Sequence, residues 1–482
     1  MADYFDIPFV GQSFEGRSVE LNSQSAVNWY LEDNRHDAIT PMALMPTPGL
    51  AVVDSVGAGT HRGAIEFKGD AYFVVGSDLV KMTTSETFTT VGTLLTTSGS
   101  VSMASNGYQG DQMIIVDGTY GYLWDGTTLS QITFGFSVSP EFVVFLDSYF
   151  LINNKDTGQF YRSAINNGNS WSSTDVATAE RDPDNLNSLA VNQRDLWLFG
   201  EYTTEVWYND ASSFGFGPYN NALIEWGILA HNSVATAEHT VLWLSQNRNG
   251  KAQVMQGQGN QAKPVTTRGI EYTFQTYSTL EDATAYTYQQ AGHTFYVLNF
   301  PTENVTWVYD LFSHSWHTRS SVVNGVDARH LGETHLYFNG KNYIGDYDSG
   351  NLYTYDLGVY TDNGESIKRK RITPHLTSHL LEKPKEGKTI RYRQLEVWLG
   401  TGIGLTSGQG SEPTLGLRWS DDGGHTWSNK RYATASKKGQ YGYRMIFSHL
   451  GASRDRIFEI TVSDPVKWVL IKVLAKVQLS AW

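Results

Sequence analysis

An eight-residue segment late in the sequence has its residue types at the spacing of a defined turn motif, the Asp-box S-x-D-x-G-x-T-W. Its five specified positions are Ser420, Asp422, Gly424, Thr426 and Trp427. In this turn Asp422 can accept backbone N–H bonds, Gly424 supplies a positive φ, and Trp427 packs the returning strand over the loop. Repeated Asp-boxes are typical of sialidases and related glycosidases. Because the complete motif occurs once in this sequence, it favours a structural hairpin over an enzymatic site.

The remaining residues give little support for catalytic chemistry. A glycosidase needs two carboxylates at a defined separation, and the 49 Asp and Glu residues single out no pair. A sialidase also needs an arginine clamp for the substrate carboxylate, which the ten arginines of residues 1–360 leave possible but unsupported. No Walker-type G-x-x-x-x-G-K-[ST] or G-x-S-x-G sequence occurs. We therefore expect no enzyme, no catalytic residue and no cofactor.

Patterns that could bind a metal are incomplete. Asp346 and Asp348 belong to a turn sequence that could offer oxygen ligands to calcium, but the spaced Glu of an EF-hand is missing. His314 and His317 flank Trp316, and on a strand this spacing places them on opposite faces. The chain has no cysteine, so thiolate sites and disulfides are excluded. We expect no metal site.

The densest basic run is Lys368-Arg369-Lys370-Arg371. These side chains could contact phosphate or the acidic surface of a partner, and a solvated linker is the alternative interpretation. Aromatic residues do not interleave with the run, so single-strand or sequence-specific nucleic-acid binding is not expected.

Charge is distributed unequally along the chain. Residues 1–360 contain 16 Lys and Arg against 38 Asp and Glu, a net charge of −22, whereas residues 361–482 contain 20 against 11, a net charge of +9. The change of sign near residue 360 predicts a domain boundary there. The acidic part is a poor surface for gripping DNA.

The elements that would position these residues are strands. The content of Tyr, Phe, Trp and Gly, with only 18% charged residues, favours an all-β fold. Short aromatic or aliphatic strands next to turn residues recur about every 44 residues, at Tyr72, Met113, Tyr149, Leu196, Leu242, Phe295 and Leu336. Four short antiparallel strands fit in one period, which is the size of a propeller blade. The sequence predicts a β-propeller of six or seven blades, with two stacked β-sandwiches as the alternative.

Three regions are predicted. Residues 1–56 are expected to be an N-terminal arm with extended segments, residues 57–360 the acidic β-propeller, and residues 361–482 a basic C-terminal β-sandwich. The polar stretch from residue 361 to 374 is expected to be a linker that enters a new strand. Residues 1–11 lack the features of a secretory signal, and lysines interrupt the apolar run 466–479, so no membrane span is expected.

Several short segments are informative through their order along the chain. They are Asn28-Trp29-Tyr30, Pro46-Thr47-Pro48-Gly49-Leu50, Arg62-Gly63, Val101-Ser102-Met103-Ala104 with Asn106-Gly107, Phe199-Gly200 with Thr204-Glu205-Val206-Trp207, and Val308-Tyr309-Asp310 with Trp316. Taken in this order, the segments resemble the packaged-DNA stabilisation proteins, or tail-hub proteins, of short-tailed phages. The resemblance covers most of the chain and includes no catalytic signature, and the Asp-box cannot be assigned to the family pattern.

The resemblance implies a structural protein of the virion tail that forms a homo-oligomeric ring, a hexamer, and closes the DNA-filled head. It also implies contacts with the portal-adaptor (head-to-tail connector) protein, the tail needle and tail fibre or spike proteins. The ring is expected to enclose DNA without tight or sequence-specific binding, and the absence of cysteine fits assembly in the host cytoplasm. The alternative is a carbohydrate-binding or glycoside-degrading propeller of a phage tail, which the Asp-box motivates.

Overall fold

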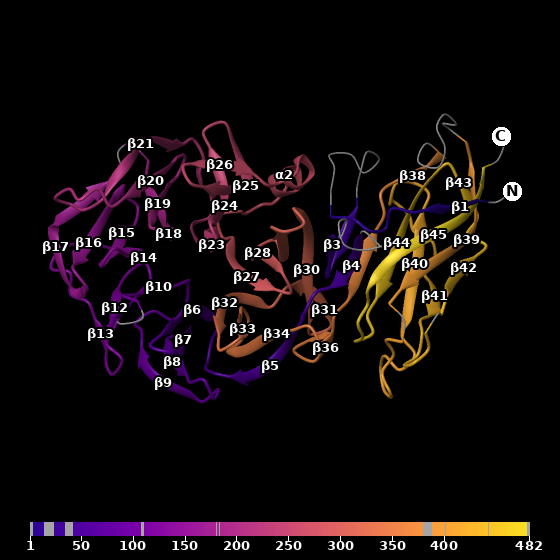
Figure 1. Cartoon of the computed structure of the whole chain (residues 1–482), viewed down its shortest axis with the longest axis horizontal. Coiled ribbons are helices and arrows are strands. Elements are labelled where there is room, and N and C mark those ends of the chain that lie inside the picture. The colour runs from indigo at the N-terminus through magenta and orange to yellow at the C-terminus, as the bar shows by residue number, and fades with distance from the viewer. Residues whose placement is uncertain are drawn as a thin grey trace.

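The computed structural model describes residues 3–13, 24–33, 42–107, 110–179, 181–182, 184–378, 388–400, 402–441 and 443–479. Within these ranges the chain is almost entirely β-structure, with short helices such as α2 (Arg268–Gln275) and the 3-10 helix η1 (His231–Ser233). None of the described helices is long and apolar enough to span a membrane. The strands form a ring of sheets and a sandwich beside it (Figure 1).

Among the described residues, seven antiparallel blades, each with four main strands, follow one another in sequence order around a ring (Figure 1). The innermost strand of each sheet lies beside those of its two neighbours, and β32 next to β6 closes the circle. The predicted all-β propeller is therefore confirmed, with the larger of the two predicted blade numbers. The first four blades are β6 (His61–Phe67), β7 (Asp70–Val75), β8 (Asp78–Met82) and β9 (Phe88–Thr93); β10 (Ser102–Ser105), β11 (Met113–Val116), β12 (Gly121–Trp124) and β13 (Leu129–Gln131); β14 (Pro140–Leu146), β15 (Tyr149–Asn154), β16 (Gln159–Ala164) and β17 (Asn167–Thr178); and β18 (Leu186–Asn192), β19 (Asp195–Gly200), β20 (Thr204–Tyr208) and β21 (Gly217–Ile224).

The last three blades carry additional strands beyond the basic four. The fifth has β22 (Gly227–Ile228) paired to β24, and the sixth continues into β31 (Val326–Arg329). Their main strands are β23 (Ala235–Ala237), β24 (Thr240–Asn247), β25 (Gly250–Gln258) and β26 (Gln261–Pro264); β27 (Thr284–Gln290), β28 (His293–Phe300), β29 (Val305–Asp310) and β30 (Ser315–Val323); and β32 (Gly332–Phe338), β33 (Lys341–Asp346), β34 (Asn351–Asp356) and β5 (Gly49–Ser55).

The seventh blade closes the ring with a strand from the N-terminal part of the chain. β5 pairs antiparallel with β34, with Leu50 opposite Tyr355 and Ser55 opposite Asn351. Because this blade combines strands from both ends of the propeller sequence, the ring cannot open without breaking the ladder between them. Residues 49–55, assigned to the arm from the sequence, are thus the fourth strand of a blade.

Turn residues explain where the strands begin and end. Asn339-Gly340 joins β32 to β33 at φ 46° and 78°, the two-residue turn conformation that matches the twist of the flanking strands. The recurring segments fall on the second strand of the first six blades, whereas Leu336 falls on the first strand of the seventh. Aromatic strands on both sides of the Asn339-Gly340 turn account for this one-strand offset.

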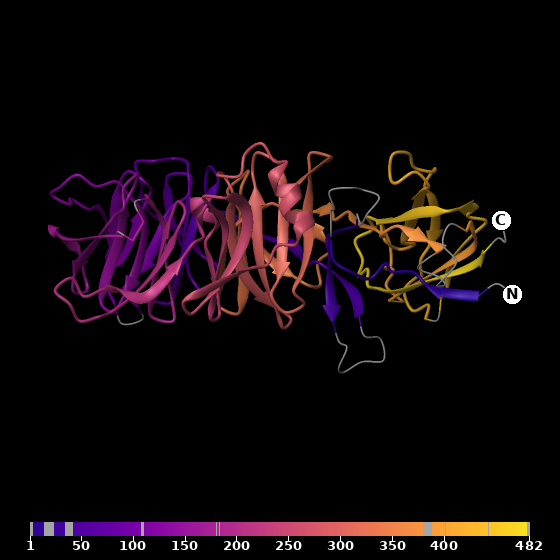
Figure 2. The same ribbon diagram turned by 90° about the horizontal axis from the view of Figure 1, so that it is seen from above.

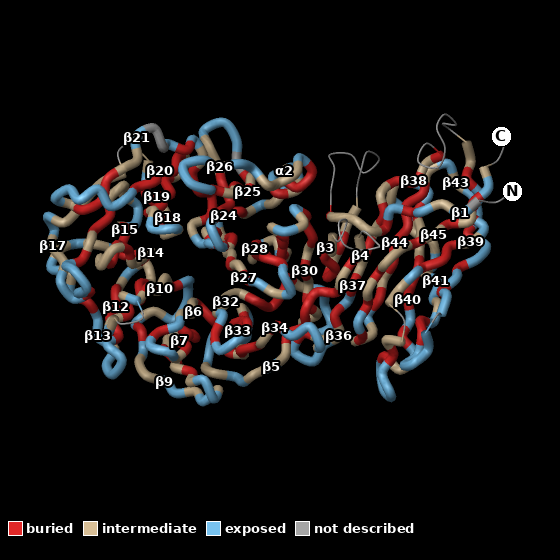
Figure 3. The backbone as a smooth tube through the Cα atoms, in the orientation of Figure 1, coloured by how far each residue is buried: buried red, intermediate tan, exposed pale blue. Residues whose placement is uncertain are grey.

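The second domain is a β-sandwich, as predicted. One sheet has the order β3-β4-β45-β39-β42, with β1 paired to β45 and β43 to β39. The facing sheet has the order β2-β37-β44-β40-β41, with β38 paired to β44. Apolar side chains of both sheets form one core. Figure 3 shows that buried residues recur along the strands of this domain. The strands are β1 (Asp3–Asp6), β2 (Ser25–Val27), β3 (Trp29–Asp33), β4 (Met42–Pro46), β37 (Arg369–Ile372), β38 (Leu376–Thr377), β39 (Ile390–Leu399), β40 (Thr414–Ser420), β41 (Arg431–Thr434), β42 (Met445–Ser448), β43 (Ala452–Ser453), β44 (Asp455–Val462) and β45 (Leu470–Leu479).

The described part of the N-terminal segment is built into this sandwich and does not form a separate arm. β1 pairs with β45, and β4 pairs with β45 at Leu44 and Leu470. The indole N–H of the buried Trp29 donates to the carbonyl of Trp468 at 2.8 Å. The propeller is therefore inserted between two segments of the sandwich, whose first and last strands lie side by side at the far end of the molecule (Figure 2).

One sheet crosses from the propeller to the sandwich. β2 pairs parallel with β30 of the sixth blade and antiparallel with β37 of the sandwich. The expectation of a linker at residues 361–374 is wrong, because this stretch contains β35 (Thr361–Asp362), β36 (Glu365–Ser366) and β37. Its polar composition is misleading because β35 pairs with β5, and β37 pairs with β2 and β44, all of which are remote in the sequence.

Candidate functional site

Asn28 links the two domains where the sheet crosses between them. Its buried side chain donates from Nδ2 to the carbonyls of Ser320 in β30 and Lys368 beside β37, both at 2.9 Å. Its Oδ1 accepts the Ser320 N–H at 3.0 Å. The backbone of Asn28 has φ 58°, a conformation that asparagine tolerates better than most residues. A single amide thus satisfies backbone groups of the propeller and the sandwich together.

A buried histidine makes a second polar link between the domains. His293 in β28 contacts Asp310 Oδ2 through Nδ1 at 2.8 Å and Glu32 Oε2 of β3 through Nε2 at 3.0 Å. Burial alone would lower the pKa of His293, but the two carboxylates outweigh it and the pKa is raised. The His293 ring therefore bridges a propeller carboxylate and a sandwich carboxylate.

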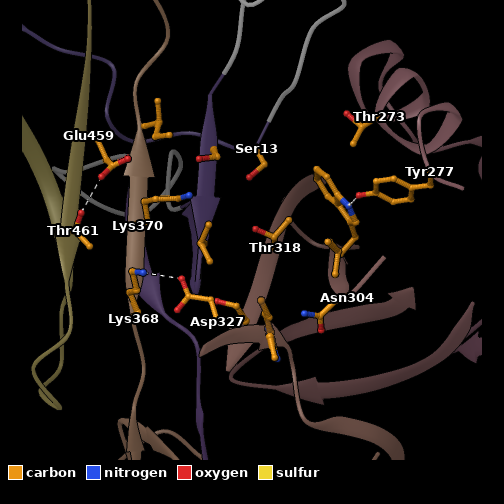
Figure 4. A pocket seen from close by; sticks show the side chains of 18 of the residues that line it. Ser13, Thr273, Tyr277, Asn304, Thr318, Asp327, Lys368, Lys370, Glu459 and Thr461 are labelled. Carbon is orange, nitrogen blue, oxygen red and sulfur yellow. Dashed lines mark hydrogen bonds and ion pairs between the residues drawn. The ribbon is translucent and has the colours of Figure 1, made fainter. Parts of the chain in front are cut away.

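A cleft of about 790 Å³ lies beside this junction (Figure 4). Its propeller wall presents polar side chains such as Thr318, Ser320 and Asn304. Four cationic side chains belong to the sandwich wall, namely Lys368, Lys370, Arg418 and Lys430. The carboxylates of Asp327 and Glu459 also line the cleft. Excluding Arg319, whose guanidinium donates to Tyr288 within the propeller, the lining therefore carries more positive than negative charge.

Strand alternation divides the predicted basic run into two pairs. In β37 the side chains of Arg369 and Arg371 are fully buried, while Lys368 and Lys370 line the cleft. Arg371 donates to the carbonyls of Phe9, Gln12 and Ser25 at 2.5 to 3.2 Å and to Gln24 Oε1 at 2.7 Å, and Arg369 donates to those of Ile367 and Thr47, both at 3.4 Å. Burial lowers the pKa of Arg369 to about 10 and that of Arg371 to about 9, so both stay charged at neutral pH. Neither the predicted contact with phosphate or a partner nor the alternative of a solvated linker holds for the two arginines, because both are buried. Contact with phosphate or a partner stays a prediction for the two lysines.

The cations of the cleft differ in how they are paired. Lys368 Nζ contacts Asp327 at 2.7 Å, and Arg418 Nη2 contacts Glu459 at 2.6 Å. Lys370 Nζ has no hydrogen-bond or ion-pair partner among the described residues. In the described part of the chain, Lys430 Nζ donates to the Thr461 hydroxyl alone, at 3.2 Å. Burial lowers the pKa of Lys430; Glu459 raises it, while the neighbouring cations lower it further.

The stem of Lys430 crosses the sheet at a glycine. A Cβ atom added to Gly416 would lie 2.7 Å from Lys430 Cδ. The absence of a side chain at Gly416 therefore allows Lys430 to lie across β40 and to reach Thr461 on β44.

The five Asp-box residues lie together where the chain leaves β40: Ser420 is the last residue of β40, and the other four lie between β40 and β41. Asp422 Oδ1 accepts the Thr426 N–H at 2.8 Å and the Ser420 hydroxyl at 2.6 Å, and Gly424 has φ 96°. These hydrogen bonds hold the pKa of Asp422 well below its usual value. The Trp427 ring stacks on the Arg418 guanidinium, 4.5 Å from the ring centroid. The turn therefore helps to position one cation of the cleft.

The residues considered for metal binding lie elsewhere and have local partners. Asp346 accepts the Asp348 N–H, the Ser349 hydroxyl and the Tyr353 hydroxyl at 2.6 to 2.9 Å, which is a turn network. His314 Nδ1 contacts the Tyr309 hydroxyl at 3.1 Å. No group of three or more His, Asp or Glu side chains placed to hold a metal exists in the described part of the chain.

The junction roles of Asn28, His293, Arg418 and Lys430 were not predicted from the sequence, where Asn28 is named only within a segment of the family resemblance. The alternation of Leu415, Leu417 and Trp419 could have placed Arg418 on the outer face of its strand. Nothing in the sequence, however, indicates that this face lies against the propeller. Asn28 contacts Ser320 and Lys368, at sequence separations of 292 and 340 residues, and no local pattern predicts such contacts.

Two family models together match most of the chain. The model described as "Bacteriophage P22 Gp10, beta-propeller" matches residues 11–360, and the model described as "Bacteriophage P22 Gp10, beta-sandwich" matches residues 376–478. Among curated protein sequences, none matches this one.

The chain also matches solved structures at low sequence identity. A structure titled "YCF48 bound to D1 peptide" has 12% identity and a TM-score of 0.37, covering 71% of this chain and 97% of that chain. BamB from Moraxella catarrhalis has 12% identity and a TM-score of 0.36, covering 69% and 97%. A streptogramin B lyase has 7% identity and a TM-score of 0.40, covering 70% and 98%. At these scores the likenesses say nothing about function.

Proposed function

Because the chain belongs to the Bacteriophage P22 Gp10 family through both its propeller and its sandwich, and is thus a phage structural protein, we propose that it forms the tail hub of the virion. The hub closes the DNA-filled head, retains the packaged DNA and attaches the tail appendages. Copies of the chain form a homohexameric ring around the DNA exit path. The ring contacts the portal-adaptor protein on one side and the tail needle and fibre or spike proteins on the other.

The family match over both domains carries this proposal, and the architecture supports it. The chain crosses between the domains through a paired sheet and two buried polar links, at Asn28 and at His293. A body joined in this way can transmit load between a head and a tail, which a flexible tether between two domains could not. No catalytic constellation is needed for this role.

The charge of the propeller supports enclosure of DNA without a tight grip. Residues 47–360 contain 14 Lys and Arg against 31 Asp and Glu, a net charge of −17, and the rest of the chain carries +4. Tight duplex binding requires several cationic contacts to phosphates, so an acidic propeller repels the duplex. Retention then depends on closure of the ring and on its protein partners.

The experiment is to assemble particles without this protein and to follow their DNA. We expect such particles to package DNA and then lose it, measured as nuclease-sensitive DNA, and we expect added purified protein to restore retention. The purified chain should show no saturable binding to duplex DNA at physiological salt. Particles that keep their genomes without the protein would refute the proposed role.

A carbohydrate-binding role is the second candidate, and one surface favours it. On the outer face of β39 and β45, an apolar groove of about 470 Å³ is lined by Tyr4, Trp398 and Tyr443, which are 48%, 48% and 38% exposed. Exposed aromatic rings of this kind can stack on sugars. A glycan array with Trp398→Ala as the negative control distinguishes the candidates, because the hub role requires no glycan binding at this groove.

A further inference from the structure

We propose that the cleft between the propeller and the sandwich is a binding site for a small compound carrying one or two phosphate groups. The site is formed by Lys368 and Lys370 (Figure 4) together with Lys430, all of the sandwich, with polar side chains of the propeller wall opposite them.

The cleft has unsatisfied positive charge. Four cationic side chains face two carboxylates in its lining, and Lys370 has no partner among the described residues. Ser25, which also lines the cleft, has a buried hydroxyl without a hydrogen-bond partner in the described structure. Partial burial of like charges is unfavourable unless an anion lies between them. The cleft is therefore suited to an anion.

The residue types favour phosphate over a carboxylate. Planar carboxylates pair best with the planar guanidinium of arginine, and Arg418 is already paired with Glu459. The remaining cations are lysines, which bind phosphate as point charges, and the Ser320 hydroxyl and the Asn304 amide stand on the opposite wall. A DNA duplex is too wide for a cleft of about 790 Å³, so the expected ligand is a free phosphate compound.

A ligand in this position would touch both domains. Thr318 belongs to β30 of the propeller, whereas Lys370 belongs to β37 of the sandwich. A phosphate bound between them strengthens the junction that Asn28 and His293 already make. Binding to the folded state alone also raises the melting temperature.

The test is isothermal titration calorimetry of the full chain with inorganic phosphate and with pyrophosphate, at matched ionic strength in chloride. We expect saturable binding at one site. Lys370→Ala should weaken it at least about tenfold, the loss of one charge-assisted hydrogen bond. Gly416→Ala should also weaken it, because the added Cβ displaces the Lys430 stem without removing a charge. Lys467→Ala removes the same charge at an exposed position outside the cleft and should leave the affinity within about twofold.

Succinate and a short DNA duplex serve as competing ligands in the same titrations. Absence of saturable phosphate binding to the full chain at millimolar concentrations overturns the proposal. An equal loss of affinity in Lys467→Ala and Lys370→Ala does the same, because it indicates a nonspecific charge effect. Preferential binding of succinate or of the duplex also overturns it, in favour of an acidic protein segment or the genome as the occupant.

Discussion

The propeller and the sandwich are both made of antiparallel sheets, but the chain builds them in different ways. Each of the first six blades takes its four main strands from consecutive hairpins. The sandwich combines strands from residues 3–46 with strands from residues 369–479, and the hydrogen bond from Trp29 to Trp468 spans 439 positions. Blade formation is therefore local, whereas the sandwich depends on long-range contacts whose loop closure costs entropy.

The two domains also differ in their buried ionisable groups, although both bury arginines, such as Arg319 in the propeller. The propeller contains histidines such as His61 and His330, whose pKa values burial lowers. The sandwich buries Arg369 and Arg371, which keep their charge and donate mainly to backbone carbonyls. We therefore expect mild acid to destabilise the propeller through protonation of its histidines. We expect substitution of the buried arginines to destabilise the sandwich.

The largest effect should follow removal of the side chain that connects the two segments of the sandwich. Trp29→Ala leaves a cavity and an unpaired carbonyl at Trp468, and we expect a loss of about 3 to 5 kcal/mol in the free energy of unfolding. Hydrogen exchange should place the loss in the sandwich strands and spare β10 to β21. Trp398→Ala, at a position that is 48% exposed, is the matched control and should cost less than about 1 kcal/mol. Similar losses in both variants would contradict the long-range dependence of the sandwich.

A pair of substitutions within β37 tests its alternation. Arg371→Ala removes the donors to three carbonyls and one amide oxygen, and we expect a loss of about 2 to 3 kcal/mol. Lys370→Ala, one residue away on the cleft side, should change stability by less than about 0.5 kcal/mol. Urea unfolding of both variants gives the comparison, and a costly Lys370→Ala would show that the strand faces are assigned incorrectly.

Acid should affect the propeller through His61. Burial lowers the pKa of His61 to about 4, from an ordinary value of 6.5. Below pH 6.5 the unfolded chain takes up a proton that the folded state excludes, so stability is lost as the pH falls toward 4. From pH 7 to pH 5 this lowers the free energy of unfolding by about 2 kcal/mol. His61→Gln should remove that part of the pH dependence measured by urea unfolding.

Asp362 should act in the opposite direction. Burial raises its pKa to about 6, from an ordinary value of 3.8, so its contribution to stability is present below pH 3.8 and is lost as the pH rises through 6. As the pH falls from 7 to 5, protonation of Asp362 raises the free energy of unfolding by about 1 kcal/mol. Asp362→Asn should therefore make the acid-induced loss larger, and an unchanged slope in both variants would contradict these assignments.

The smallest effect is expected at the Asp-box. Asp422→Ala removes acceptors for Thr426 and Ser420 at an exposed turn, so faster hydrogen exchange at the Thr426 amide should be the main change. Because Trp427 contacts Arg418, the variant should also weaken phosphate binding slightly. Loss of a glycosidase activity without loss of stability would instead identify the motif as enzymatic.

The sequence predicted the parts of this molecule that local chemistry controls. The repeated aromatic strands predicted a propeller because each blade needs only neighbouring hairpins, and Asn339-Gly340 marks a turn by its own φ preferences. The complete spacing of the Asp-box placed its five residues in one turn. The polar composition of residues 361–374 led to the wrong prediction of a linker, because pairing with remote strands overrides local composition.

The sequence by itself therefore determined the all-β class, the repeated blades, the turn between β40 and β41 and the unequal charge along the chain. Only the tertiary structure decided that the N-terminal segment completes the sandwich and that Arg371 is buried while Lys370 faces a cleft. The physical reason is that burial of a strand face depends on what packs against it. At this junction the strands, walls and charges come from segments hundreds of residues apart, so no local pattern contains them.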